Sequence, residues 1–261
     1  MLDSLYIGAT GMQVQQLNVD TVANNLANVN TVGYKRSRID FEDLLYRSVA
    51  TTSQAGTTTA AATEGGKGMG AAVASVGKVF TVGDVKKTDE PLDLAISGQG
   101  FFEIVMPDGT LAYTRNGAFQ LNADGTLVTR DGYPLNASIQ VPADTTSIQV
   151  GANGQVLATV AGENRAVDLG QIELTTFQNP SGLTALGDNL FVPTENSGIA
   201  TPQVPGEGGA GLLRQGFLES SNVRLIDEMV ALIVAQRAYE INAKVVQASD
   251  ELLSISNSLY R

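Results

Sequence analysis

The feature that most constrains the fold is a strict four-three spacing of mainly apolar residues near both ends of the chain. The first stripe consists of Leu5, Ala9, Met12, Gln16, Val19, Ala23 and Leu26. The second consists of Val234, Ala238, Ile241, Val245, Ala248, Leu252, Ile255 and Leu259. Such a narrow stripe is typical of a coiled-coil seam and not of an ordinary core helix. Each end therefore needs a partner helix. That partner is either the other end of the same chain or a neighbouring copy, and the sequence leaves both open.

The absence of three residue types limits the possible chemistry. The 261 residues include no Cys, His or Trp. Without Cys there is no disulfide and no thiolate metal site, and without His the commonest general base and metal ligand is missing. We therefore predict a protein that is not an enzyme and that uses no cofactor and no metal ion.

The charge balance limits the possible partners. The net charge is −11, from 16 basic and 27 acidic residues, which disfavours binding to nucleic acid and to anionic lipid. No segment is apolar enough to suggest a membrane span, so we expect no direct membrane insertion. The first thirty residues contain no Lys or Arg, and this argues against a cleaved signal peptide.

The two stripes predict long helices over residues 3–29 and 223–260, the second capped by Asn222. Between residues 92 and 194, short β-branched or alternating segments are separated by Asp-Gly and Asn-Gly dipeptides. These features predict seven or more strands in an antiparallel sandwich or barrel. The Ser-, Thr-, Ala- and Gly-rich stretch 48–72 predicts a linker or extended arm, and the Gly- and Pro-rich segment 195–215 predicts a loop.

The predicted fold class is α+β, with long terminal helices paired as a coiled coil around an outer β domain. Residues 1–30 and 222–261 form the terminal domain, and residues 92–194 form the outer domain. The connecting domain comprises residues 31–91 and 195–221, and it includes the low-complexity stretch 47–65.

Three local motifs have simpler interpretations than ligand binding. Gly66–Gly70 follows no strand and lacks the ending of a phosphate loop. Asn122–Gly125 resembles the start of a calcium loop but lacks the later Glu, so a hairpin turn is preferred. In the pair Phe101-Phe102, only one ring can face the interior of a strand, and the other either lies against a neighbouring element or subunit or is an ordinary surface aromatic.

Four segments together resemble signatures of the flagellar rod and hook axial proteins. They are Ala23–Lys35, Asp93–Phe102, Gly216–Val223 and Gln236–Asn242. Chain length, Phe41–Tyr46 and Gly209–Gly216 favour a distal-rod member over the proximal-rod and hook members, which remain the alternative. A secreted β-domain enzyme or cell-wall-binding module is an alternative from a different class.

The resemblance implies a structural subunit that polymerises into a stiff tube, with the terminal helices lining its inner wall. Its implied partners are copies of itself, proximal rod proteins, the hook protein, the peptidoglycan-ring and outer-membrane-ring proteins, and the flagellar type III export gate. The implied location is the rod crossing the periplasm, reached without a cleaved signal. Residues 47–65 would stiffen this tube.

The resemblance also implies an export motif, an apolar residue four places after a Phe, which matches Phe41 and Leu45. The alternative for this pair is a packing contact within a helix.

Overall fold

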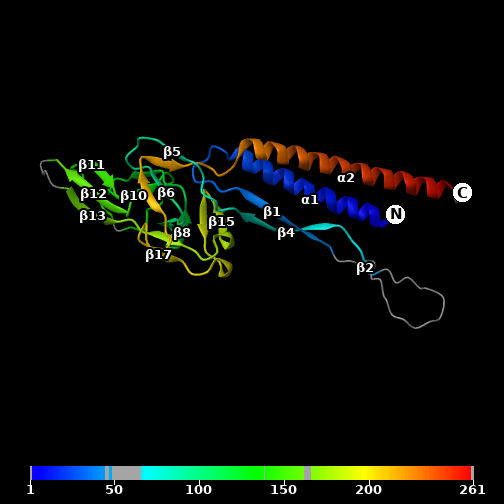
Figure 1. Ribbon diagram of the computed structural model, residues 1–261, viewed down its shortest axis with the longest axis horizontal. Helices are drawn as coiled ribbons and strands as arrows, with labels where there is room; N and C mark the ends of the chain where they lie inside the picture. The colour runs from blue at the N-terminus through cyan, green and yellow to red at the C-terminus, as the bar shows by residue number, and fades with distance from the viewer. Residues whose placement is uncertain (1, 45–46, 49–65, 138, 162–165, 260–261) are drawn as a thin grey trace, which may run out of the picture. The chain divides into compact units, whose positions relative to one another are not determined.

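The computed structural model describes residues 2–44, 47–48, 66–137, 139–161 and 166–259 (Figure 1). The chain divides into two compact units. The helical unit comprises residues 1–26, 37–77 and 225–261. The β unit comprises residues 27–36 and 78–224.

Two long helices dominate the helical unit, as predicted. Helix α1 spans Leu2–Ala27 and helix α2 spans Leu225–Leu259. The two run antiparallel along each other, because Ser4 contacts Ser249 while Asn25 contacts Glu228. Helix α1 is not stabilised mainly by sequence propensity, since it carries Gly8 and Gly11 in its interior, and packing must supply its order.

The helical unit also contains two short antiparallel pairs of strands. Strand β1 (Ser37–Asp43) pairs with β4 (Ala71–Lys78), and β2 (Arg47–Ser48) pairs with β3 (Gly66–Lys67). The predicted arm therefore ends in regular structure, because a partner strand gives the small residues of β4 a hydrogen-bonding ladder. Most of the stretch 47–65, predicted to stiffen an assembly, lies outside the described residues.

The β unit is built from small antiparallel sheets. Its largest sheet has the strand order β15-β16-β8-β7, from Thr184–Gly187, Leu190–Val192, Leu111–Thr114 and Phe102–Val105. A three-stranded sheet joins β11 (Thr145–Val150), β12 (Gln155–Val160) and β13 (Ala166–Gln171).

The other strands of the β unit form two-stranded pairs: β9 (Phe119–Leu121) with β10 (Leu127–Thr129), β14 (Leu174–Thr176) with β17 (Thr201–Gln203), β18 (Leu212–Gln215) with β6 (Leu94–Ser97), and β19 (Phe217–Glu219) with β5 (Val85–Lys87). Short 3-10 turns cover Pro180–Gly182 and Glu195–Ser197. The α+β class predicted from the sequence is confirmed, and the closure of these sheets into one sandwich remains a prediction.

Two hydrophobic clusters form the core of the β unit, one on each side of strand β7. Phe102 is fully buried in the larger cluster, with Leu94, Ile96 and other aliphatic residues. Phe101 is buried in the second cluster, edge-on to the rings of Phe80, Phe177 and Phe191. Of the two alternatives for the second ring, packing against neighbouring elements of the chain is confirmed, and a surface position is wrong.

Segment 195–215, predicted as a loop, contains two strands. Strand β17 pairs with β14, and β18 pairs with β6, where Leu213 lies opposite Ile96. The Gly- and Pro-rich composition concealed them, since strands this short are identified only by their partners.

The glycines of four Asp-Gly and Asn-Gly dipeptides adopt the positive φ that tight turns need, and they are Gly109, Gly125, Gly132 and Gly154. Gly117 does not, and a Cβ on it would lie 1.6 Å from the carbonyl oxygen of Leu94. This glycine is therefore required for a close approach of two backbones and not for a tight turn.

Asn222 was predicted as the cap of the final helix, and this is wrong. Helix α2 begins at Leu225, three residues later. The Asn222 side chain instead lies within the β unit, where Oδ1 accepts a hydrogen bond from the backbone nitrogen of Arg36 (2.8 Å) and Nδ2 donates to the carbonyl oxygen of Val79 (2.8 Å). It ties three segments of the β unit together.

Candidate functional site

The closest contacts on the face that joins α1 to α2 are made at Gly and Ser positions of α1. A Cβ on Gly8 would lie 2.7 Å from Cγ2 of Val246, and a Cβ on Gly11 would lie 2.8 Å from Nδ2 of Asn242. The hydroxyl groups of Ser4 and Ser249 are 3.3 Å apart. Because glycine and serine are small, the two helix backbones approach each other closely along this face. We call it the inner face.

The two stripes predicted from the sequence lie mainly off the inner face. On α1, Leu5, Met12, Val19 and Leu26 are half-buried, whereas Ala9, Gln16 and Ala23 are exposed. On α2, Ala238 is half-buried, and the exposed members are Val234, Ile241, Val245, Ala248, Leu252 and Ile255. Leu259 belongs to α2, but its side chain lies outside the described part of the structure.

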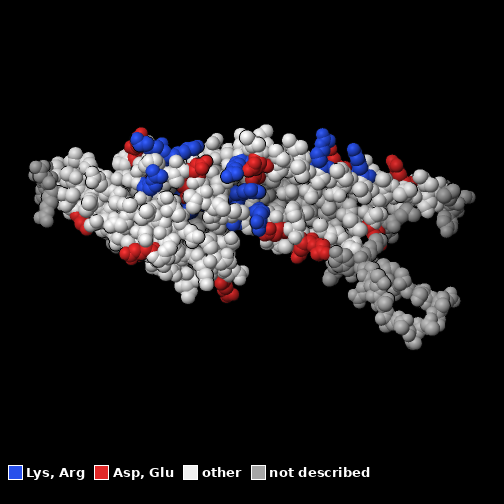
Figure 2. Space-filling view, in the orientation of Figure 1, with Lys and Arg blue, Asp and Glu red and all other residues white. Residues whose placement is uncertain are grey.

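The exposure of the α2 stripe is large for apolar side chains. Val234 is 62% exposed and Ile241 is 61% exposed. Further apolar residues of α2, including Ile226, Val230 and Ile233, are also exposed. One face of the molecule shows few charged side chains over the two helices (Figure 2). Apolar surface of this extent on a long helix is typical of an interaction site.

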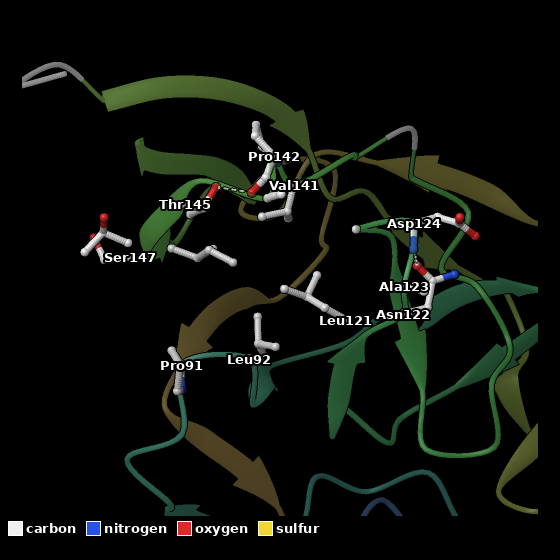
Figure 3. A pocket seen from close by; sticks show the side chains of 14 residues that line it. Pro91, Leu92, Leu121, Asn122, Ala123, Asp124, Val141, Pro142, Thr145 and Ser147 are labelled. Carbon is white, nitrogen blue, oxygen red and sulfur yellow. Dashed lines mark hydrogen bonds between the residues drawn. The ribbon is translucent and has the colours of Figure 1, made fainter. Parts of the chain in front are cut away.

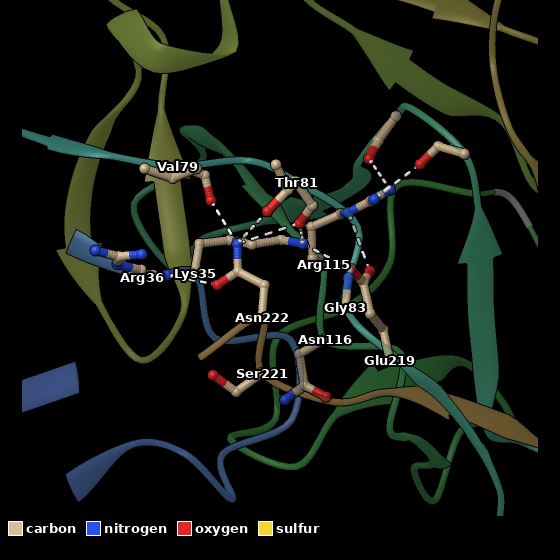
Figure 4. Close-up of polar contacts among 12 residues, drawn as sticks. Lys35, Arg36, Val79, Thr81, Gly83, Arg115, Asn116, Glu219, Ser221 and Asn222 are labelled. Carbon is tan, nitrogen blue, oxygen red and sulfur yellow. Dashed lines mark hydrogen bonds and ion pairs between the residues drawn. The ribbon is translucent and has the colours of Figure 1, made fainter. Parts of the chain in front are cut away.

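A buried ion cluster lies in the β unit (Figure 4). Lys35 Nζ is 2.6 Å from Glu219 Oε1, and Arg115 Nε is 3.1 Å from Glu219 Oε2. Lys35 also donates to the carbonyl oxygen of Thr81 (2.7 Å), and Arg115 donates to the carbonyl oxygens of Gly98 (2.8 Å) and Gly100 (2.7 Å). The cluster thus connects segments that are far apart in the sequence.

Burial disfavours the charged forms of both cations. It lowers the pKa of Lys35, and Glu219 opposes this effect while Arg115 adds to it. Burial also lowers the pKa of Arg115, again against the attraction of Glu219. One carboxylate compensates two cations, so the cluster depends on Glu219 more than on either partner. No local sequence pattern predicts this cluster, because its members are separated by dozens of residues.

A groove of about 530 Å³ in the β unit is lined by Leu92, Leu121, Val141, Pro142 and others (Figure 3). Its one amide side chain, Asn122, accepts hydrogen bonds from the backbone nitrogens of Asp124 and Thr126, so it serves a turn. The prediction of a hairpin turn at Asn122–Gly125 is therefore confirmed. Within the described residues there is no group of acidic side chains that could hold a metal ion.

The candidate export motif is described only in part. Phe41 lies in strand β1 with half of its surface exposed, whereas Leu45 is outside the described residues. The alternative reading of this pair as a contact within a helix is wrong, because strand β1 contains Phe41. None of the described helices is both long and apolar enough to span a membrane.

Three family models match successive parts of the chain. Residues 5–35 match the model described as a flagella basal body rod protein. Residues 95–158 match the D1 domain of the flagellar hook protein FlgE/F/G, and residues 214–259 match the C-terminal part of the flagellar basal body rod protein FlgEFG.

Full-length relatives are also named as flagellar basal-body rod proteins. The flagellar basal-body rod protein FlgG of Borreliella burgdorferi is 46% identical, over 100% of both chains. The protein of that name from Buchnera aphidicola subsp. Schizaphis graminum is 44% identical, over 97% of this chain and 98% of its own. This chain belongs to the flagellar basal-body rod protein family. A flagellar hook-basal body complex protein, FlhP of Bacillus subtilis, is 28% identical over 99% of this chain.

The residues of the ion cluster come from all three regions that match the family models. Lys35, Arg115 and Glu219 lie one in each of the three matched regions. The cluster is therefore the point where the amino-terminal, central and carboxy-terminal parts of the family pattern meet inside the β unit. The relatives are named as rod and hook-basal body proteins.

Proposed function

We propose that this chain is the subunit of the distal rod of the bacterial flagellum, where copies polymerise into a stiff tube that transmits torque to the hook. The observation that carries this proposal is the exposed apolar stripe of α2 in a chain of the rod protein family. The intrachain pairing of α1 and α2 leaves this stripe uncovered, so a neighbouring copy is its natural partner.

Burial of the apolar stripe of α2 between copies would stabilise the polymer. Burying an exposed Val, Leu or Ile side chain contributes about 1.5–3 kcal/mol. Several such residues along α2 would together offset the entropy lost when a subunit joins a polymer. We propose that the stripes of neighbouring copies pack as a coiled coil lining the inside of the tube, with residues 1–30 and 222–261 as the inner domain. Residues 31–91 and 195–221 would connect this domain to the outer domain 92–194.

The same proposal includes the other partners of a distal rod. They are the proximal rod proteins, the hook protein, the proteins of the peptidoglycan and outer-membrane rings, and the export gate. The rod would cross the periplasm, and its subunits would be exported without a cleaved signal, with Phe41 and Leu45 as the export motif. The higher identity to the FlgG rod proteins than to the FlhP protein supports the rod over a hook-related position.

The variant Ile241→Glu tests whether the apolar stripe of α2 is the contact between copies. The residue is exposed in the single chain, so the free energy of unfolding should change by no more than about 0.5 kcal/mol. A charge buried between copies would be unpaired, so rods should not form and cells should not swim. Gln247→Glu adds the same charge at another exposed position of α2 and should leave motility unchanged. Normal rods with Ile241→Glu would exclude this stripe as the subunit contact.

The distal position needs a separate experiment. Residues 47–65 are replaced with the corresponding junction of a hook protein in cells that otherwise lack the chain. We expect rods that bend, and electron microscopy of isolated basal bodies measures their curvature. Rods as straight as those of the parent would contradict a stiffening role for this stretch.

A further inference from the structure

The contacts across the inner face follow one register. Ser4 faces Ser249, Gly11 faces Asn242, and Asn25 faces Glu228. These positions differ by multiples of seven on both helices, in opposite directions. A seven-residue repeat keeps one face of each helix toward its partner. It also permits a shifted pairing, because a slip of seven residues brings an equivalent face into contact.

Asn25 and Glu228 are the polar members of this face that are most deeply buried, each only 1% exposed. Asn25 Nδ2 lies 3.4 Å from Glu228 Oε2 and donates to the carbonyl oxygen of Ser37 (2.9 Å). Asn25 Oδ1 accepts a hydrogen bond from the backbone nitrogen of Ser37 (2.8 Å). One side chain therefore joins the end of α1, the first turn of α2 and the start of β1.

A slip by seven residues breaks this contact in either direction. In one direction Asn25 would face Ala235, whose side chain cannot form a hydrogen bond, and Glu228 would face position 32, beyond the end of α1. In the other direction Glu228 would face the amide of Asn18, but Asn25 would face position 221, before the start of α2. The small residues elsewhere on the inner face distinguish less between the native and the shifted registers, because a Gly or Ser fits against many neighbours.

We propose that Asn25 is a positioning residue that, with Glu228, selects the register of the α1–α2 pair. A buried polar contact on a heptad repeat fixes the register because every other alignment leaves a polar group without that partner. The register in turn determines which side chains of α2 face outward. This inference rests on the proposed function at one point only. The register matters for assembly because it presents the apolar stripe of α2 to the next subunit.

Because the chain contains no cysteine, engineered pairs report the register directly. Ser4→Cys with Ser249→Cys joins the native register, where the two hydroxyl oxygens lie 3.3 Å apart. Ser4→Cys with Ser256→Cys joins a register shifted by seven residues. Each pair is oxidised in dilute full-length chain in the cold, and the intramolecular crosslink is measured by gel mobility and mass spectrometry.

In the parent chain we expect the native pair to crosslink and the shifted pair to crosslink far less. Asn25→Leu should reduce the ratio of native to shifted crosslink about tenfold, which corresponds to the cost of one lost buried polar contact. Asn24→Leu makes the same change on the exposed side of α1 and should keep the parent ratio. Glu228→Gln keeps a hydrogen-bonding partner of the same shape and should also keep it.

The double variant Asn25→Leu, Glu228→Leu distinguishes a mixed register from unfolding of the helices. An apolar pair should preserve the helical circular dichroism signal while the register becomes mixed. An unchanged crosslink ratio in Asn25→Leu, or the loss of both crosslinks in the double variant, would overturn the proposal. Assembly of rods by the parent cysteine chains is scored separately in cells, so a failure of the proposed function is distinguished from a failure of this inference.

Discussion

At the scale of single residues, the β unit depends on buried polar groups whose partners come from distant segments. Glu219 accepts from the backbone nitrogen of Gly83 (2.8 Å) in addition to its contacts with Lys35 and Arg115. Asn222, three residues later, holds the segment around Val79. Because the carboxylate of Glu219 is buried, removing it costs more than the loss of an average surface ion pair.

Glu219→Gln should therefore be strongly destabilising. The change leaves two buried cations with no carboxylate, and we expect the free energy of unfolding to fall by about 3–5 kcal/mol. Urea denaturation of the purified chain measures the loss. Glu173→Gln, at an exposed position of the β unit, is the matched control and should change stability by less than about 0.5 kcal/mol. Equal stability of the two variants would contradict the structural role of the cluster.

Tyr113 provides a prediction for alkaline pH. Burial raises the pKa of its phenol to about 12, and the facing Glu103 adds to the shift. The unfolded chain ionises near pH 10, while the folded chain keeps the proton until about pH 12. The folded state thus binds more protons in this window, and stability should fall by about 2 kcal/mol as pH rises through it.

The Tyr113 effect is isolated by comparison with Tyr113→Phe. The difference in unfolding free energy between the two chains is measured by urea denaturation at pH values below 10 and toward 12. We expect the parent to lose stability faster than the variant. Parallel curves would show that this tyrosine does not carry the effect.

At the scale of elements, partner strands decide where structure forms. Strands β6, β8 and β12 could be predicted, because they consist of β-branched or alternating residues. Strands β17 and β18 could not, because they are three and four residues long and lie in a Gly- and Pro-rich segment. Such strands exist only through their ladders with β14 and β6.

Leu213 tests whether β18 belongs to the core. It is 3% exposed, whereas its neighbour Leu212 is 49% exposed. Leu213→Ala should reduce the free energy of unfolding by about 2–4 kcal/mol because it removes buried apolar contacts and leaves a cavity. Leu212→Ala deletes the same atoms from the surface and should have little effect. Thermal denaturation of both variants makes the comparison, and similar melting temperatures would show that β18 is not part of the folded core.

At the scale of the whole molecule, the two units differ in what holds each of them together. The β unit contains two buried hydrophobic clusters and the ion cluster. The helical unit joins its helices through Gly, Ser and Asn and leaves apolar side chains of α2 exposed. Since small and polar contacts contribute little burial energy, the helical unit should be the less stable of the two in the isolated chain.

Limited proteolysis with an unspecific protease checks this difference in stability. We expect early cuts in α1 and α2 and a resistant fragment that covers most of residues 78–224, identified by mass spectrometry. Chains in isolated rods should be protected at the same helix positions, because neighbouring copies would cover them. Early cuts within the β unit of the free chain, with intact helices, would contradict this order.

The sequence by itself determined the two terminal helices, the β character of the middle and the family, because hydrophobic period, turn dipeptides and local motifs are properties of neighbouring residues. The tertiary structure decided which face of each helix pairs within the chain. A hydrophobic stripe contains apolar residues, whereas the closest contacts of the inner face are made by Gly8, Gly11 and Asn25 of α1 with Val246, Asn242 and Glu228 of α2. Only the packed pair of helices shows that these residues face each other, and that the apolar stripe of α2 remains exposed in the single chain.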